Sequence, residues 1–199
     1  MRSKSFHAVV MAAAVVLAVQ VAQAHPGHGA GGGLSAGLAH PFSGIDHIMA
    51  MIAVGMLATQ IGGKMLWGLP ATFVALMVGG GLMNFAGVRV PWVEQGIMAS
   101  VLVLGLMVAA AGRFPTSASL SLVGFFAIFH GFAHAAEMHK GTSAMGYALG
   151  FVIATATLHA IGIALGLAAG KLASKQLVRF AGAAIAACGL LLFMHVIAA

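Results

Sequence analysis

The chain has 199 residues, of which 61% are hydrophobic and only 6% are charged. A soluble globular domain carries about a quarter charged residues, so this composition excludes a water-soluble fold. Nine lysines and arginines against three acidic residues give a net charge of +6. These basic residues stand singly at the ends of apolar stretches, which excludes the basic face of a nucleic-acid-binding protein. The single cysteine, Cys188, excludes both a disulfide framework and a thiolate metal cage within one chain.

The first 24 residues have the pattern of a secretory signal peptide. A basic start with Arg2 and Lys4 precedes an apolar core over residues 8–19, and Ala22-Gln23-Ala24 fits the small-x-small cleavage rule. We expect cleavage after Ala24, and an uncleaved membrane anchor is the alternative. The mature chain would then begin with a periplasmic segment rich in histidine and glycine, residues 25–36, in which residues 29–36 form a flexible linker.

The rest of the chain, residues 37–199, is predicted to be one transmembrane domain. Its mean hydropathy is high, and apolar stretches of about 20 residues recur, each long enough to cross a bilayer. The predicted fold class is therefore all-α, a polytopic bundle of six transmembrane helices after a cleaved signal peptide. The expected spans are 37–60, 65–87, 92–112, 117–137, 143–169 and 177–198.

The remaining charges predict the orientation of these spans. With the mature N-terminus outside, the cytoplasmic ends carry five basic residues and the outside loops two, which agrees with the positive-inside tendency. The cytoplasmic set is Lys64, Arg113, Lys171, Lys175 and Arg179, and the outside set is Arg89 and Lys140. Six spans also divide into two halves of three that run in opposite directions, as in transporters built from inverted repeats.

The first cluster of polar residues opens the first predicted span. It contains His40, Asp46 and His47, and Met51 follows on the same apolar stretch. Helical offsets of seven and four let His40, His47 and Met51 share one face. Pro41 and Gly44 favour a break or irregular first turn, which would free backbone carbonyls as additional ligands.

The second cluster closes the fourth predicted span. His130, His134 and Glu137 follow the i, i+4, i+7 stripe of a helix, so two imidazoles and a carboxylate point the same way. The first and fourth spans run antiparallel, which places both clusters toward the outer side of the membrane. Such a mixture of ligands suits nickel, cobalt, zinc or copper rather than magnesium or calcium.

Ionisable groups within apolar spans need a partner or a function, because their insertion costs at least about 2.5 kcal/mol each near the bilayer centre. Two of the three acidic residues lie inside these clusters. The alternative is that the polar residues hold helices together through hydrogen bonds. Weaker candidates for metal binding are His159 in the fifth span, which is otherwise a proton relay or a packing residue, and His25 and His28.

These motifs resemble the HupE/UreJ family of small membrane permeases. The resemblance covers nearly the whole chain, including the leader before His25 and the stretches His40-Pro41-x-x-Gly44-x-Asp46-His47 and His130-Gly131-x-Ala133-His134-x-x-Glu137. Where the family usually has a glycine after the second histidine, this chain has Ala135. The resemblance implies a bacterial inner-membrane permease that imports nickel, or cobalt, through the two clusters.

The absence of a G-x-x-x-x-G-K-[ST] fingerprint in the sequence indicates a secondary transporter rather than an ATP-driven one. We expect a divalent metal ion as substrate, the bilayer as environment, no tightly bound cofactor and no enzymatic activity. A different class stays open, an intramembrane zinc-dependent hydrolase or other membrane metalloenzyme, since histidine pairs beside a carboxylate also bind catalytic zinc. The sequence does not decide whether the protein is a homo-oligomer.

Overall fold

The computed structural model describes residues 33–111, 114–139, 141–171 and 175–198. The predicted signal peptide, together with His25 and His28, lies outside the described residues. Within them every regular element is a helix, which confirms the all-α prediction. The elements in order are α2 (Gly33–Ala39), the 3-10 helix η2 (His40–Phe42), α3 (Ile45–Ile61), α4 (Met65–Phe85), α5 (Val93–Ala109), α6 (Thr116–Ala136), α7 (Ala144–Lys171) and α8 (Lys175–Ala198).

Helices occupy all six ranges in which the sequence predicts membrane spans. Four of them, α4, α6, α7 and α8, are long and apolar enough to cross a membrane. The segments 33–42 and 45–61 make a fifth span only as a pair bent by 79°. α5 has 17 residues and rises about 25 Å, less than the roughly 30 Å of a hydrocarbon core. The chain is a multi-pass membrane protein, and six crossings stay a prediction.

The glycine-rich stretch before the first cluster is partly helical. α2 begins at Gly33, whereas the sequence suggested a flexible linker through residue 36. This helix packs along α7, and a Cβ atom added at Gly37 would collide with the backbone of Tyr147. The glycines at this point therefore permit close contact between helices. Composition alone does not distinguish this use of glycine from a flexible linker.

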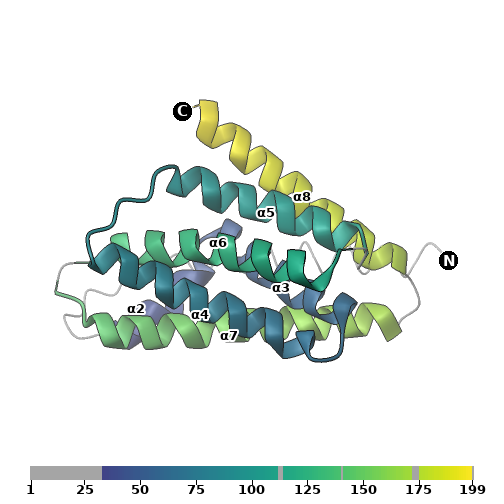
Figure 1. Ribbon diagram of the computed structural model, residues 1–199, viewed down its shortest axis with the longest axis horizontal. Coiled ribbons are helices and arrows are strands. Elements are labelled where there is room, and N and C mark those ends of the chain that lie inside the picture. The colour runs from purple at the N-terminus through teal and green to yellow at the C-terminus, as the bar shows by residue number, and fades with distance from the viewer. Residues whose placement is uncertain (1–32, 112–113, 140, 172–174, 199) are drawn as a thin grey trace.

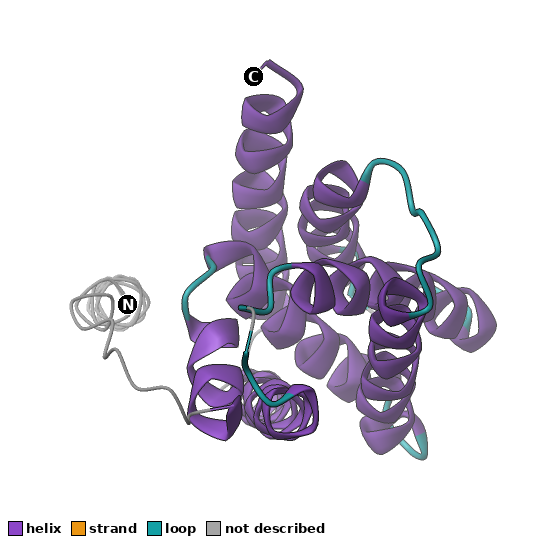
Figure 2. Ribbon diagram, turned by 90° about the vertical axis from the view of Figure 1, so that its left-hand side faces the viewer, coloured by secondary structure: helices purple, strands orange, loops and turns teal. Residues whose placement is uncertain are grey.

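Besides α2 with α7, three close helix pairs build the bundle: α3 with α7, α4 with α6, and α5 with α8. Each contains a glycine where two backbones meet, namely Gly55 against α7, Gly131 against α4 and Gly105 against α8. Small residues allow such approach in lipid, where no hydrophobic effect drives helices together. α8 runs obliquely away from the bundle beyond α5 (Figure 1), and the end view shows the same divergence (Figure 2).

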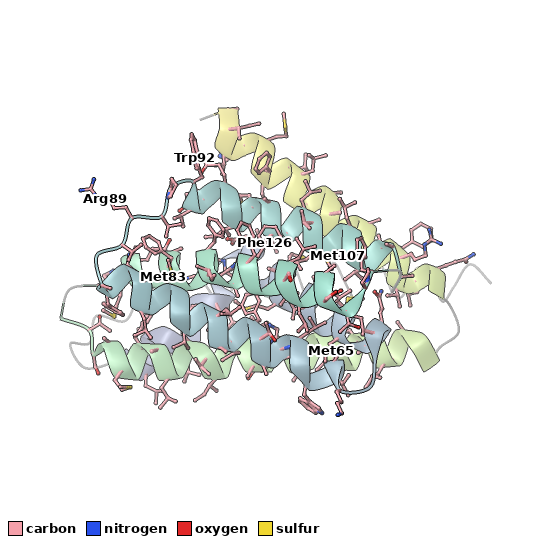
Figure 3. All side chains as sticks on the ribbon, viewed as in Figure 1. Met65, Met83, Arg89, Trp92, Met107 and Phe126 are labelled. Carbon is pink, nitrogen blue, oxygen red and sulfur yellow. The ribbon has the colours of Figure 1, made fainter. Side chains whose placement is uncertain are left out.

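Successive helices run in alternating directions, so their connections lie at two opposite ends of the molecule (Figure 1). Arg89 and Trp92 project from the α4–α5 connection at one end, while Met65 lies toward the other (Figure 3). Gly62 and Gly63, with φ of +73° and +56°, make the turn that precedes Met65. We call the end with the α4–α5 and α6–α7 connections the predicted outer end, because the sequence places both connections outside the cytoplasm.

Candidate metal site

The first cluster lies on both sides of a sharp break in the chain. On one side of the break, His40 is the first residue of η2 and is followed by Pro41. On the other side, Gly44 is in an extended conformation, and Asp46 and His47 lie in the first turn of α3. The helices on the two sides meet at 79°. The predicted break is therefore present, but the expectation that His40 and His47 share one face of a single helix is wrong. They approach the site from two different helix axes.

Two backbone carbonyls at this break, those of His40 and Gly44, accept hydrogen bonds. The amide of Ser43 donates to the carbonyl oxygen of His40 at 2.9 Å, and the Ser43 hydroxyl donates to the same oxygen at 2.6 Å. The amide of Ile48 donates to the carbonyl of Gly44 at 3.2 Å. The local turn thus uses the carbonyls of His40 and Gly44, and carbonyl ligands at this break stay a prediction.

The second cluster lies on the last two turns of α6. His130 and His134 are buried, with 0% and 3% exposure. Glu137, the last residue of the predicted span, caps the C-terminus of α6 and lies one residue beyond the apolar helix that is long enough to cross a membrane. His130 Nδ1–H donates to the carbonyl oxygen of Phe126 at 3.0 Å, which leaves its Nε2 as a lone-pair donor for a metal. That Nε2 atom is buried and has no hydrogen-bond partner within the described residues.

The two clusters converge at the predicted outer end of the bundle. The ring centroids of His47 and His134 lie 4.1 Å apart, those of His40 and His134 lie 4.8 Å apart, and those of His47 and His130 lie 5.3 Å apart. One nitrogen from each of His40, His47 and His134 lies within 4.8 Å of the others. Ligands of one ion with metal–nitrogen bonds of about 2.1 Å are roughly 3 to 4 Å apart, so a small inward movement of the rings completes a site.

Asp46 is linked to the histidine cluster by a hydrogen bond with His47. His47 Nδ1–H donates to Asp46 Oδ2 at 2.8 Å, and this bond fixes the tautomer in which His47 Nε2 carries the lone pair. The Nε2 atom is buried without a hydrogen-bond partner in the part of the chain that the structure describes. A carboxylate that orients a metal-binding imidazole in this way is a common companion of histidine ligands. In the structure Asp46 Oδ2 is thus placed on His47 rather than turned away from it, and its expected place among the direct ligands stays a prediction.

Glu137 joins the two clusters. Its Oε2 atom accepts a hydrogen bond from His40 Nε2–H at 3.0 Å and lies 3.5 Å from His134 Nδ1. Contacts with His134 and His40 hold the pKa of the Glu137 carboxyl below its ordinary value. The carboxylate is thus ionised at neutral pH, and together with Asp46 it can balance the charge of a divalent cation.

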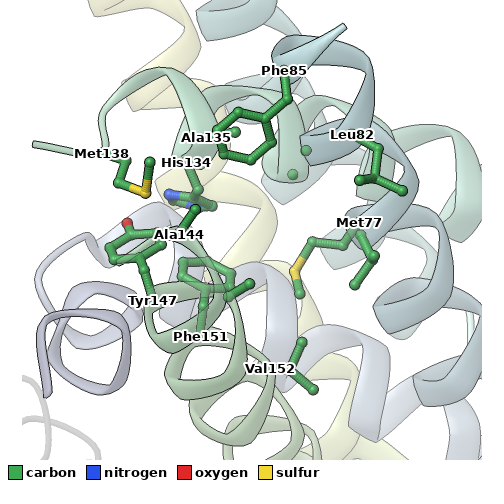
Figure 4. A pocket seen from close by; sticks show the side chains of 14 residues that line it. Met77, Leu82, Phe85, His134, Ala135, Met138, Ala144, Tyr147, Phe151 and Val152 are labelled. Atoms are coloured by element: carbon green, nitrogen blue, oxygen red, sulfur yellow. The ribbon is translucent and has the colours of Figure 1, made fainter. Parts of the chain in front are cut away.

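Sequence reasoning missed an aromatic wall along the site. Phe151 lies 4.1 Å from the His134 ring centroid, and Tyr147, which stacks on Phe151, lies 5.9 Å from the His40 ring. Both residues line a mostly apolar cavity of about 100 Å³ between α4, α6 and α7, with His134 at its wall (Figure 4). The signal in the sequence was the single tyrosine of the chain, one helical turn before a phenylalanine.

The weaker candidates are not members of the group formed by His40, His47 and His134, or lie outside the described residues. Met51 follows His47 by one turn of α3 and is fully buried in the hydrophobic core. His159 lies near the middle of α7, 1% exposed, with its ring 5.1 Å from that of Phe73. His25 and His28 belong to the part of the chain that is not described.

Fold and site together define a class, a multi-pass helical membrane protein with a buried histidine–carboxylate cluster near one end. The HupE / UreJ protein family matches residues 13–192. Protein HupE of Rhizobium leguminosarum bv. viciae is 46% identical over 170 residues, which cover 85% of this chain and 88% of that protein. No solved structure matches. The chain belongs to the HupE/UreJ family.

Proposed function

We propose that this protein is a secondary transporter that imports a divalent transition-metal ion across the bacterial inner membrane, with nickel as its principal cargo and cobalt as its second. The mature N-terminus is periplasmic in this proposal. The observation that carries it is the convergence of His40, His47 and His134 from separate membrane-embedded segments. Buried ionisable residues are costly in a bilayer and mark ion pathways by default.

The ligand chemistry supports this class of cargo. Neutral imidazole nitrogens bind nickel, cobalt, zinc and copper well, whereas magnesium and calcium prefer oxygen ligands. The choice of nickel and cobalt rests on the family resemblance, because three imidazoles do not distinguish among these metals. The carboxylates of Asp46 and Glu137 are each paired with a histidine. Membership of the HupE/UreJ family supports a carrier over the metalloenzyme alternative.

The exposure of the cluster supports entry from the predicted outer end. The side chain of Glu137 is 50% exposed and that of His40 is 28% exposed, while His134 is 3% exposed and His130 is fully buried. A hydrated ion would first meet Glu137 and His40, then exchange its water for the nitrogens of His47 and His134. His130 would be the innermost nitrogen of the group.

The helix pairs support an inverted repeat. In such a repeat, α3, α4 and α5 of the first half correspond in order to α6, α7 and α8 of the second half. The pair α3·α7 then corresponds to the pair α6·α4, and the pair α5·α8 corresponds to itself. These are the three close pairs of the bundle. The closest partner of each helix thus belongs to the opposite half. Rocking of rigid three-helix halves would separate the tightest backbone contacts, such as Gly131 against Met77.

The moving units in this proposal are therefore the pairs α3·α7 and α4·α6. The histidine cluster lies between them, because α2, η2 and α3 carry His40 and His47 while α6 carries His130 and His134. The cavity beside His134 also lies between α7 and the α4·α6 pair. Relative movement of the two pairs would close the outer access and open the site toward the cytoplasm, as alternating access requires.

The proposal is tested by uptake of radioactive nickel into cells that express the protein. His130→Ala and His134→Ala, alone and together, should abolish uptake at unchanged protein level. The matched control is His195→Ala, which removes an exposed histidine in the last turn of α8 and should leave uptake at the wild-type rate. Unchanged uptake in the double variant would refute the assignment of the site.

A further inference from the structure

His159 is a buried histidine that the converged cluster does not use. It lies near the middle of α7 with 1% of its surface exposed. Neither of its ring nitrogens has a hydrogen-bond partner within the described residues. A histidine that only held helices together would direct at least one nitrogen to a donor or acceptor, since buried polar groups are normally paired. Its lone pair is therefore available to a ligand.

The aromatic ring of Phe73 contacts both His159 and the innermost histidine of the cluster, His130. The centroid of Phe73 lies 5.5 Å from that of His130 and 5.1 Å from that of His159. The side chains of both Phe73 and His130 are fully buried. Phe73 thus connects a histidine of α6 with a histidine of α7. This contact crosses between the α4·α6 pair, which carries Phe73 and His130, and α7, which carries His159.

Other donor atoms lie one helical turn away on the same elements. The hydroxyl of Thr155, four residues before His159, donates to the sulfur of Met77 at 3.8 Å, and Met77 follows Phe73 by four residues on α4. Along α7, His159 comes eight residues after Phe151, which contacts His134. At 1.5 Å per residue, His159 lies about 12 Å further along α7 than Phe151.

We propose that His159 is an inner binding position for the transported metal ion, reached from His130 when the Phe73 ring moves aside. The inference rests on the proposed function and extends it from one site to two. An ion with one imidazole ligand and its remaining water molecules is held weakly. Weak, successive positions suit a conduction path, because an ion must leave each position as well as enter it.

The test places a spectroscopic ligand at position 159. Cys188 is the only cysteine, so Cys188→Ala gives a background in which an introduced thiol is unique. In that background, the full-length protein with His159→Cys is purified in detergent and titrated with cobalt(II). A thiolate-to-cobalt charge-transfer band in the near ultraviolet is expected. The matched control is Leu165→Cys on the same helix, 49% exposed, which should give no such band.

Absence of the band in the His159→Cys protein, while cobalt still binds the cluster, would overturn the inner position. His159→Ala provides a second measurement in case the cysteine variant does not fold. It should keep cobalt binding within about twofold of wild type and lose at least about tenfold of nickel flux in reconstituted vesicles, and unchanged flux would also overturn the inference. If the wild-type protein itself neither binds cobalt nor carries flux, it is the proposed function that fails.

Discussion

Replacement of Asp46 tests whether this carboxylate orients a ligand or binds the metal itself. Asp46 accepts the Nδ1–H of His47 at 2.8 Å, and removal of such a carboxylate partner typically lowers metal affinity 10- to 100-fold. In Asp46→Asn the amide oxygen can still accept that hydrogen bond, so only the charge is lost. We expect nickel affinity to fall about tenfold, or about 1.4 kcal/mol, in Asp46→Asn and nearer to 100-fold in Asp46→Ala.

Isothermal titration of the purified protein with nickel measures this series, with His47→Ala as the reference for loss of a direct ligand. His195→Ala, exposed on α8, serves as the control and should bind nickel as wild type does. The orienting role predicts the order Asp46→Asn, Asp46→Ala, His47→Ala, with the smallest loss first. An Asp46→Asn protein that binds nickel as poorly as His47→Ala would show that the carboxylate is itself a ligand, and unchanged affinity in both Asp46 variants would show that it has no part in the site.

Two further predictions concern packing and pH. A Cβ atom at Gly80 would collide with the backbone of α6, whereas one at Gly79 would meet nothing within 4 Å. Both Gly→Ala changes alter helix propensity equally, so Gly80→Ala should be less stable than Gly79→Ala by about 1–3 kcal/mol of overpacking, measured by thermal unfolding in detergent; equal stability would contradict the close α4·α6 contact. His134 and His40 hold the pKa of Glu137 below its ordinary value. The negative charge of the Glu137 carboxylate, which stabilises its contacts with these histidines, is therefore present at neutral pH and is lost only as pH falls through that lowered pKa. Glu137→Gln should therefore weaken nickel binding at neutral pH but keep the loss of binding on acidification, because imidazole ligands must be deprotonated to bind a metal, and a titration in which this loss disappears would contradict that origin.

The local part of this architecture could be predicted from the sequence. Apolar stretches located the helices to within a few residues, because a membrane demands both length and apolarity from each segment. The i, i+4, i+7 spacing placed His130, His134 and Glu137 on one side of α6, and antiparallel succession brought them to the depth of His40 and His47. Each of these features depends on neighbours in the chain or on the two surfaces of the bilayer.

The remaining features depend on contacts between distant segments. Nothing near Asp46 in the sequence distinguishes a ligand from a partner of His47, since that depends on which atoms face the centre of the cluster. The places of Tyr147 and Phe73 beside the histidines follow from the pairing of α3 with α7 and of α4 with α6. That pairing is set by glycines at contact points, which in the sequence are indistinguishable from the other small residues of an apolar helix. For the same reason the helical start at Gly33 could not be separated from a linker.

Metal flux into reconstituted vesicles tests the central claim most directly. Purified protein is inserted into lipid vesicles, and the entry of nickel, cobalt, zinc and copper is compared under an imposed proton gradient. The account predicts protein-dependent entry of nickel and cobalt that His134→Ala abolishes. Vesicles that accumulate none of these ions, or that accumulate them equally well with His134→Ala, would contradict it.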